Sequence, residues 1–250
     1  MIIKIPHKEK IYHCNLAKPI DISIPLGQVK CFYATDFEVK AYTSGNFVGA
    51  VKAGAPVNFF DVQMNPHGNG THTEGLGHIT EAQEAVNEVL KQYHFIAQVV
   101  SVEWTEIKNG DQVISYQKLQ AACPEVLPDA LVLRTLPNSK DKLTKDYSGT
   151  NPPYLEAEAI SFLVEQGVQH LLLDLPSVDR EVDEGKLLNH RLFWKVEGKT
   201  ATAVARKNCT ITELIFVPDE VKNGLYLLNI QIPSMPLDAA PSKPVLYELY

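Results

Sequence analysis

The segment from His67 to His78 concentrates side chains that bind metal ions. A chain of 250 residues with eight histidines places three of them here, together with one carboxylate: His67, His72, His78 and Glu74. Imidazole and carboxylate groups together suit zinc, manganese or iron. His72 and Glu74 are two residues apart, so in an extended chain both point to the same side. The segment predicts a metal site, and the alternative is a polar turn whose histidines bind nothing.

Four glycines interrupt the same segment, at positions 68, 70, 75 and 77. Glycine lets the backbone bend sharply and approach a ligand closely. Metal motifs on a helix face need histidines four residues apart in a helix-forming sequence. The glycines therefore favour an irregular or extended ligand segment over a helical one.

Two further candidate ligands lie downstream. His190 follows an acidic, loop-like stretch, and Glu213 lies inside the apolar run from Thr210 to Phe216. A carboxylate is costly to bury unless it is paired or bound to a metal. Glu213 either faces inward toward a cation or lies on the solvent face of an alternating strand, and spacing alone leaves both open.

Residues that could contact a substrate lie near these motifs. Phe59 and Phe60 precede the histidine segment and could line a flat apolar pocket, although core packing is the commoner role of phenylalanine. Ser177 lies between two aspartates in the turn Pro176 to Asp179, but the nucleophile motif Gly-x-Ser-x-Gly is missing. We therefore assign Ser177 a secondary role in binding.

The elements that must position these groups alternate between strand-like and helix-like runs. Helices are predicted at Glu81–Tyr93, where Thr80 and Gln83 have capping-box spacing, and at Glu156–Gln166, which Gly167 ends. Strands are predicted at 21–25, 29–39, 57–63, 95–107, 130–136, 168–173, 201–206, 210–217 and 225–232. The alternation predicts one α/β domain over residues 1–250, with a mixed sheet and flanking helices.

The overall composition excludes several function classes. A net charge of −7 argues against a nucleic-acid-binding surface. No apolar run approaches the length of a membrane span, and the first residues lack the pattern of a secretion signal. The four cysteines show no Cys-x-x-Cys spacing, which suggests reduced thiols and a cytoplasmic location.

Several ordered motifs resemble those of the cyclase family, which includes the bacterial kynurenine formamidases. Its signature is His-x-Gly-Thr-His-x-Asp-x-Pro-x-His, and the matching stretch here is Gly70-Thr-His-Thr-Glu-Gly-Leu-Gly-His78. The family's opening Asp-x-Ser-x-Pro-Leu and its Asp-Thr-Pro-Ser-Val-Asp are similar to 21–26 and 174–179. Its later histidine and Ile-x-Glu-Asn-Leu elements are similar to the stretches at His190 and 211–214.

The resemblance implies a swivelling β/β/α-type fold, commonly dimeric, with one or two zinc or manganese ions. Carried over by position, His72 would bind the first metal, Glu74 would replace a bridging aspartate, and His78 would be the catalytic acid/base. His190 and Glu213 would bind the second metal. The family's first histidine falls at Gly68, so either His67 or Asn69 would have to supply that ligand.

These features predict a metal-dependent hydrolase of a small amide, cyclic amide or related ester, similar to an arylformamidase. His78 would move the proton between water and leaving group. The alternative from another class is a protein that keeps the fold and binds or senses a small molecule without turning it over. The absence of a histidine at position 68 favours that alternative.

Overall fold

A mixed sheet of nine strands forms the centre of the computed structural model, which describes residues 1–250. Its strand order is β17 (Ala239–Pro241), β8 (His72–Glu74), β15 (Thr210–Glu213), β14 (His170–Leu173), β12 (Ala130–Leu136), β9 (His94–Glu103), β16 (Gly224–Gln231), β18 (Lys243–Glu248) and β3 (Ile20–Asp21). The four central strands β15, β14, β12 and β9 are parallel, and antiparallel strands extend the sheet on both sides. The predicted α/β architecture with a mixed sheet and flanking helices is confirmed.

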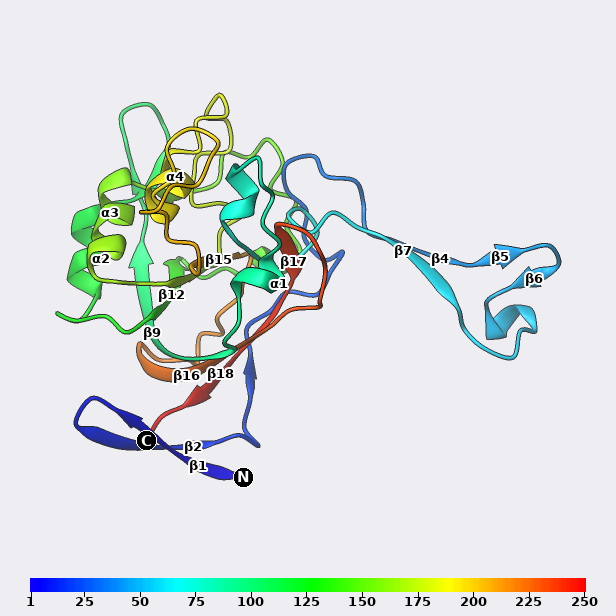
Figure 1. The fold of residues 1–250 in the computed structure, drawn as a ribbon, viewed down its shortest axis with the longest axis horizontal. Coiled ribbons are helices and arrows are strands. Elements are labelled where there is room, and N and C mark those ends of the chain that lie inside the picture. The colour runs from blue at the N-terminus through cyan, green and yellow to red at the C-terminus, as the bar shows by residue number, and fades with distance from the viewer.

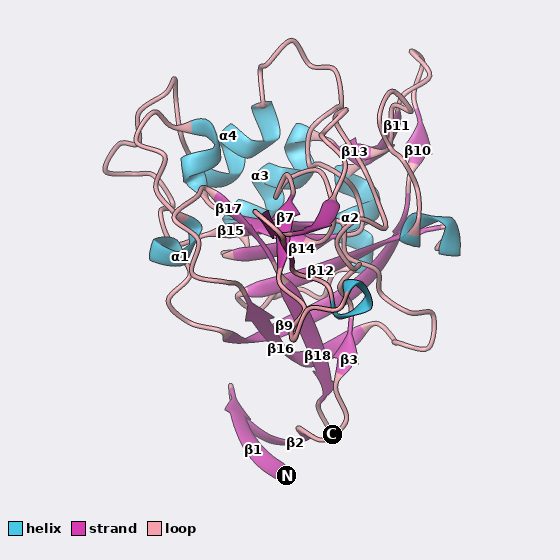
Figure 2. Ribbon diagram, turned by 90° about the vertical axis from the view of Figure 1, so that its right-hand side faces the viewer, coloured by secondary structure: helices cyan, strands magenta, loops and turns pink.

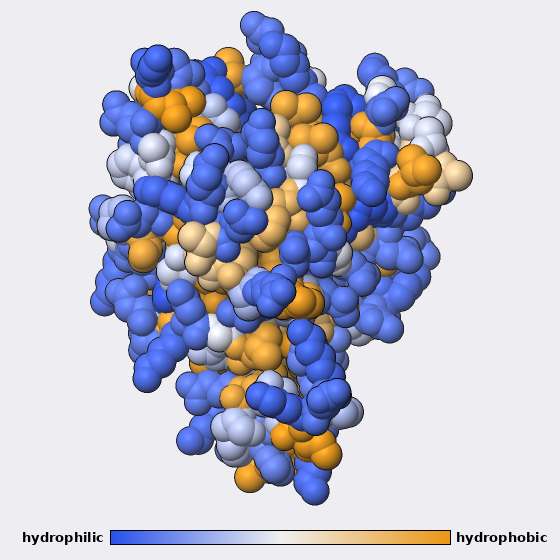
Figure 3. All heavy atoms as spheres, turned by 90° about the vertical axis from the view of Figure 1, so that its left-hand side faces the viewer, coloured by the Kyte–Doolittle hydropathy of each residue, from blue (hydrophilic) through white to orange (hydrophobic).

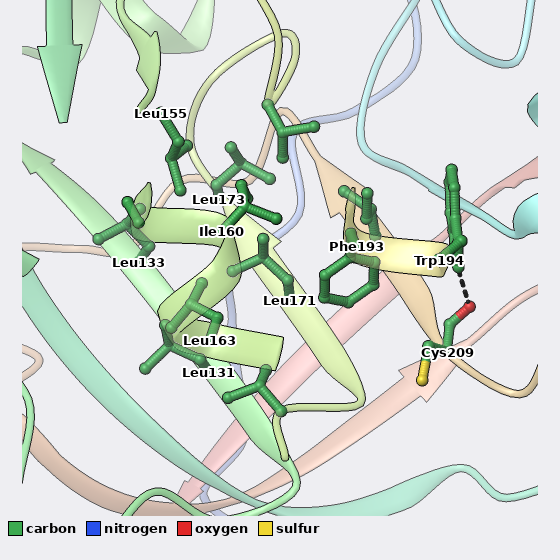
Figure 4. Packing of buried hydrophobic residues seen from close by; sticks show 14 of the residues in the cluster. Leu131, Leu133, Leu155, Ile160, Leu163, Leu171, Leu173, Phe193, Trp194 and Cys209 are labelled. Carbon is green, nitrogen blue, oxygen red and sulfur yellow. Dashed lines mark hydrogen bonds between the residues drawn. The ribbon is translucent and has the colours of Figure 1, made fainter. Parts of the chain in front are cut away.

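Side chains alternate between two cores on the two faces of this sheet. On β12, Leu131 and Leu133 point to one core, while Ala130 and Val132 point to the other. This follows from the two-residue period of a strand. Helices α2 (Tyr116–Ala122), α3 (Ala157–Glu165) and α4 (Leu188–Trp194) cover the first face (Figure 2). Figure 4 shows that core, in which the Trp194 indole donates to the Cys209 carbonyl at 2.8 Å.

The helix predicted at Glu156–Gln166 is confirmed as α3, with Gly167 in the left-handed region at φ +82°. The helix predicted at Glu81–Tyr93 is wrong, because only α1 (Val86–Val89) forms there. The Thr80 hydroxyl donates to the Glu84 carboxylate at 2.6 Å instead of capping a helix. The amides of residues 81 and 86 donate to carbonyls of residues 199 and 237. Distant backbone partners therefore replace the local helical ones.

Two other predicted strands fail because the chain turns. In the run 29–39, Phe32 and Tyr33 take φ values of +55° and +52°, so the run breaks up into an isolated bridge at Lys30 and the first two residues of β4 (Glu38–Ala41). The run 201–206 contains a turn in which the Ala205 amide donates to the Thr202 carbonyl. Both segments therefore have a strand-like composition but do not form the continuous strands that it predicts.

A long arm projects from the body of the molecule (Figure 1). It consists of β4 (Glu38–Ala41), β5 (Thr43–Ser44), β6 (Phe47–Val48), η1 (Val51–Ala53) and β7 (Phe60–Gln63). β4 pairs only with β7, and β5 only with β6. Every residue of β7 is exposed, so the arm has no cover from its own chain.

Smaller elements complete the fold. The hairpin of β1 (Ile2–His7) and β2 (Lys10–Asn15) lies near the C-terminus in Figure 1. A small sheet joins β10 (Thr105–Glu106), β11 (Gln112–Ile114) and β13 (Tyr154–Leu155), and η2 (Leu76–Ile79) and η3 (Lys140–Leu143) are single 3₁₀ turns. The face opposite the arm is mostly hydrophilic, with a narrow band of apolar side chains (Figure 3). No helix has both the length and the apolar character needed to span a membrane.

Candidate metal centre

The loop between the arm and β8 carries His67 into the body of the molecule. The Asn65 side chain accepts from the amides of His67 at 3.0 Å and Gly68 at 3.1 Å. Both polar atoms of the Asn69 side chain bond to the backbone, its oxygen at residue 65 and its nitrogen at residue 35. Asn69 therefore holds the loop, and of the two alternatives only His67 turns its side chain toward the other predicted ligands.

Position 68 has no room for a side chain. A Cβ atom added to Gly68 would lie 2.2 Å from the Cβ of Ala34, closer than two carbon atoms can approach. The preceding residue, His67, turns its imidazole toward Glu74, with Nδ1 3.1 Å from Oε2. Residues 66–70 form a turn and a bend, which agrees with the irregular segment that the glycines favoured.

Strand pairing brings the most buried ligands together. His72 and Glu74 are two residues apart on β8, and Glu213 on the antiparallel β15 lies opposite His72. Residues paired in this way share a face of the sheet. One ligand atom from each of these three side chains lies within 4.8 Å of the others, and all three residues are buried. Of the two orientations left open for Glu213, the side chain therefore takes the inward one.

His190 reaches the same place from α4. Its Nε2 lies 3.0 Å from Glu74 Oε1, and its Nδ1 lies 2.6 Å from Asp179 Oδ2. Asp179 also accepts from the amides of Asn189 and His190. A carboxylate on the far nitrogen of a metal-binding histidine fixes its tautomer and ring orientation. The sequence placed Asp179 in a motif but gave no sign of this contact.

His67 and His78 lie at the mouth of the group, beside a residue that the sequence analysis missed. His67 Nδ1 is 3.1 Å from Glu74 Oε2, and His67 Nε2 is 2.9 Å from Asp238 Oδ2. His78, in η2, places Nδ1 at 3.1 Å from the same oxygen of Asp238. Asp238 directly precedes β17, which pairs with β8. Only that pairing could have revealed it.

Opposing effects set the charges of the buried carboxylates. Burial raises the pKa of Glu74, but His78, His190 and His67 together lower that pKa well below its usual range. Burial, followed by the negative charge of Glu74, raises the pKa of Glu213. Two carboxylates in one buried site therefore differ in their affinity for a proton.

The histidine charges respond to the same carboxylates. Burial lowers the pKa of His67, but hydrogen bonds to Asp238 and Glu74 outweigh it and raise that pKa to about 10. Burial likewise lowers the pKa of His190, and its bonds to Asp179 and Glu74 raise it well above 6.5. In the metal-free protein, protons on these imidazoles supply the positive charge that the carboxylates require.

Two buried atoms at the centre, His72 Nε2 and Glu74 Oε2, make no well-oriented hydrogen bond, although His67 Nδ1 lies 3.1 Å from the second. An unpartnered buried polar group costs about 1–3 kcal/mol. Both atoms are of the type that binds zinc, manganese or iron. A divalent cation would partner both atoms, so the residues present fit such an ion.

Most of the predicted site residues line a cleft of about 340 Å³, a size that suits a small molecule. His67, Glu74, His78, His190 and Glu213 line it, and so does Ser177. Its apolar lining is limited to Phe32, Ala34 and Leu187.

Phe59 and Phe60 are not among the residues that line this cleft. They lie on the arm with 56% and 46% of their surface exposed, because the arm carries them away from the body (Figure 1). The pocket role predicted for them is therefore not met within a single chain.

Comparisons with known proteins agree with this architecture. A family model described as "Putative cyclase" matches residues 20–180. No curated protein matches the chain.

Among solved structures, a predicted metal-dependent hydrolase from Bacillus stearothermophilus is 15% identical, with a TM-score of 0.60 over 92% of this chain and 98% of its own. Isatin hydrolase A from Labrenzia aggregata is 13% identical, with a TM-score of 0.61 over 93% and 95%. Isatin hydrolase A from Ralstonia solanacearum is 14% identical, with a TM-score of 0.62 over 92% and 91%. At these identities the likeness establishes a shared fold.

Proposed function

The chain belongs to the cyclase family, and from that membership and the geometry of its site we propose that it is a metal-dependent hydrolase of a small amide, cyclic amide or related ester. The observation that carries the proposal is a pair of buried atoms without a well-oriented hydrogen bond, His72 Nε2 and Glu74 Oε2, of which Glu74 lines a cleft. An imidazole and a carboxylate left unsatisfied beside each other are what a metal site requires.

The ligands divide into two overlapping groups that would hold one or two zinc or manganese ions. His72, Glu74 and Glu213 form one set of mutually close ligand atoms, and His67, Glu74 and His78 form another. His190 adds an imidazole nitrogen 3.0 Å from Glu74. We assign His67, His72, Glu74, His190 and Glu213 to metal binding, with Glu74 common to both positions.

His78 remains free to move a proton. Its side chain lines the cleft and is 28% exposed, and only its Nδ1 is hydrogen-bonded within the protein. A divalent cation, when bound, lowers the pKa of water and polarises a carbonyl group. His78 would accept the proton of the attacking water and deliver it to the leaving nitrogen or oxygen.

The substrate is proposed by size and chemistry. A cleft of about 340 Å³ with a polar floor suits a compact carbonyl compound. Ser177 lines the cleft and could donate to a substrate oxygen. Similarity to isatin hydrolases and the family's formamidases favours a small cyclic amide or an N-formyl aryl amine. The four free cysteines of the protein favour the reducing cytoplasm as the location of the protein.

We propose further that the protein is a homodimer in which the arm packs against a second copy. The arm pairs Val39 with Val62 between strands that expose 51% and 56% of these residues. An isolated two-stranded ribbon is marginally stable in water, and contiguous exposed apolar surface marks an interaction site. In such a dimer, Phe59 and Phe60 could contact substrate only in the cleft of the second copy.

Light scattering at two protein concentrations tests the dimer. The wild-type chain should have twice the chain mass, and the double variant Val39→Ser/Val62→Ser should have the mass of one chain. A wild-type protein that is monomeric at both concentrations would refute this assembly.

The hydrolase proposal is tested by metal content and turnover. Protein purified without chelator should contain near-stoichiometric zinc, manganese or iron, and should hydrolyse N-formylkynurenine or a small cyclic amide. His78→Ala should retain the metal and lose turnover. Protein that neither contains metal nor takes it up on dialysis would support instead a binding or sensing role for the fold.

A further inference from the structure

Asp238 contacts two histidines of the site through one oxygen atom. Oδ2 lies 2.9 Å from His67 Nε2 and 3.1 Å from His78 Nδ1. The two rings lie side by side, with centroids 4.4 Å apart. No other carboxylate contacts both rings, since Glu74 is 3.1 Å from His67 but 3.9 Å from His78.

The backbone holds this carboxylate in position. The Asp238 carbonyl accepts from the Gly75 amide at 3.0 Å, and the next residue, Ala239, pairs with Glu74 in the sheet. Asp238 is therefore fixed relative to β8 and to the turn that carries His78. Its own side chain is 29% exposed, so the carboxylate is not buried at the cost of a full desolvation.

The contact determines which ring nitrogen of His78 carries hydrogen. A neutral imidazole has one donor nitrogen and one acceptor nitrogen. A carboxylate oxygen only accepts, so Nδ1 facing Asp238 must be the donor. Nε2 has no hydrogen bond within the protein and remains an acceptor on a side chain that lines the cleft. In His67, Nε2 faces Asp238 in the same way and is the donor there, while Nδ1 lies 3.1 Å from Glu74 Oε2. With a cation bound beside Glu74, Nδ1 would give up its proton and would be the nitrogen that faces the metal.

We propose that Asp238 is a positioning residue that sets the tautomers of both His78 and His67. For His78, it leaves Nε2 as the proton acceptor in the cleft. For His67, it leaves Nδ1 as the nitrogen that faces the metal site. One carboxylate thus prepares both the base and a ligand, an inference that rests on the hydrolase function proposed above.

The direct test is the tautomer of His78, observed by ¹⁵N–¹H long-range NMR correlation on histidine-labelled, zinc-saturated protein. The wild type should show a protonated Nδ1 and an unprotonated Nε2, with His78→Gln identifying the signals by their loss. In Asp238→Ala and Asp238→Asn, Nδ1 should no longer be the sole protonated nitrogen. Asp141→Asn, an exposed aspartate outside the cleft, should leave the spectrum unchanged.

Kinetics and metal binding give a second readout. At saturating zinc, Asp238→Asn should lower kcat by about 10²–10⁴-fold, as the loss of an orienting carboxylate does elsewhere, with KM changed by less than about tenfold. Zinc affinity should fall by about 10–100-fold because His67 loses its partner. Asp238→Glu, which keeps the charge, should recover part of kcat.

The two proposals can fail separately. If the wild type shows no turnover, the tautomer and zinc affinity still test Asp238. If turnover is present but the His78 tautomer and kcat are the same in Asp238→Ala, the positioning role is wrong and the hydrolase function stands. A variant that is merely less stable, with an unchanged tautomer in its folded form, would likewise overturn it.

Discussion

Replacing Glu213 with glutamine should have opposite effects on stability with and without metal. One oxygen each from Glu213 and Glu74 lies within 4.8 Å. Two full negative charges at that distance repel by about 3 kcal/mol at an effective dielectric constant of 20. Burial and the charge of Glu74 already raise the pKa of Glu213, so proton uptake relieves part of this repulsion.

The amide of the variant should relieve the rest. Glu213 Oε1 accepts from the Val178 amide at 3.2 Å, and the amide oxygen of glutamine can keep that bond. Glu213 Oε2 lies 3.4 Å from His72 Nε2, which has no partner, and the new NH₂ group can donate to it. We expect Glu213→Gln to stabilise the metal-free protein by about 1–3 kcal/mol.

The pH dependence has a definite sign. A carboxyl group whose pKa is raised in the folded state contributes stability at low pH, and that contribution is lost as pH rises through the folded-state pKa. The pKa of Glu213 is raised, so the advantage of the glutamine variant over wild type should grow as pH rises above about 4.5. Excess metal should reverse the order, because each tenfold loss of metal affinity removes about 1.4 kcal/mol of stabilisation.

Urea unfolding in EDTA and in excess zinc measures both effects. Glu220→Gln, at an exposed carboxylate, is the matched control and should leave both curves unchanged. A Glu213→Gln protein that is less stable than wild type in EDTA would refute the predicted repulsion. Equal gains in stability from zinc in the two proteins would exclude Glu213 as a ligand.

Three further changes test other parts of the structure. Asp179→Asn should weaken zinc binding by about 10–100-fold in calorimetric titration, because the His190 ring loses its carboxylate; an unchanged affinity would exclude that orienting role. Burial lowers the pKa of His170 to about 4. Neutral His170 therefore contributes about 3 kcal/mol to the free energy of unfolding above pH 6.5, and this contribution is lost as pH falls toward 4. His170→Gln should lack this part of the pH dependence of unfolding in EDTA, and identical profiles for variant and wild type would contradict the prediction. Lys142→Met should lower the free energy of unfolding in urea by about 3–5 kcal/mol, because the buried Asp174 carboxylate loses the cation that lies 2.7 Å away. The double variant Lys142→Met/Asp174→Asn should recover much of this loss. An equal loss in the double variant would show that the uncompensated charge of Asp174 is not its cause.

The central strands could be predicted because local composition and final environment agree. The run from Ala130 to Leu133 is wholly apolar, and it opens β12, which ends at Leu136 as predicted. A parallel strand covered on both faces needs apolar side chains in both directions. An apolar segment of this length therefore predicts a central strand whichever neighbouring strands it pairs with.

Segments whose partners are distant could not be predicted in this way. The pattern at Thr80–Tyr93 satisfies the rules for a helix, yet only Val86–Val89 is helical. Gln83 takes a φ of +50°, and neighbouring amides donate to carbonyls more than 100 residues away. Local preference amounts to tenths of a kcal/mol per residue, so a few long-range hydrogen bonds and packing contacts outweigh it.

The residues of the site likewise differ in whether local sequence could identify them. His72 and Glu74 could be found from their two-residue spacing, and Glu213 from its improbable place in an apolar run. Asp179 and Asp238 act on histidines that are 11 and 160 residues away. Their roles arise from how α4 and β17 meet β8, and an isolated aspartate in a loop carries no sign of such a contact.

The position of the first imidazole shows why spacing alone gives an incomplete picture of the site. Comparison by spacing finds glycine at position 68 and suggests a lost ligand. In the folded chain, Ala34 occupies the space that a side chain at Gly68 would need, and Asn65 caps the amides of residues 67 and 68 so that the loop presents His67 instead. Metal binding depends on where the ligand nitrogen lies and not on which position of the sequence supplies it. A one-residue shift of the histidine can therefore preserve the site if the backbone places the imidazole in the same region. The substitution at position 68 is therefore weak support for a lost activity, and the surrounding contacts favour a retained one.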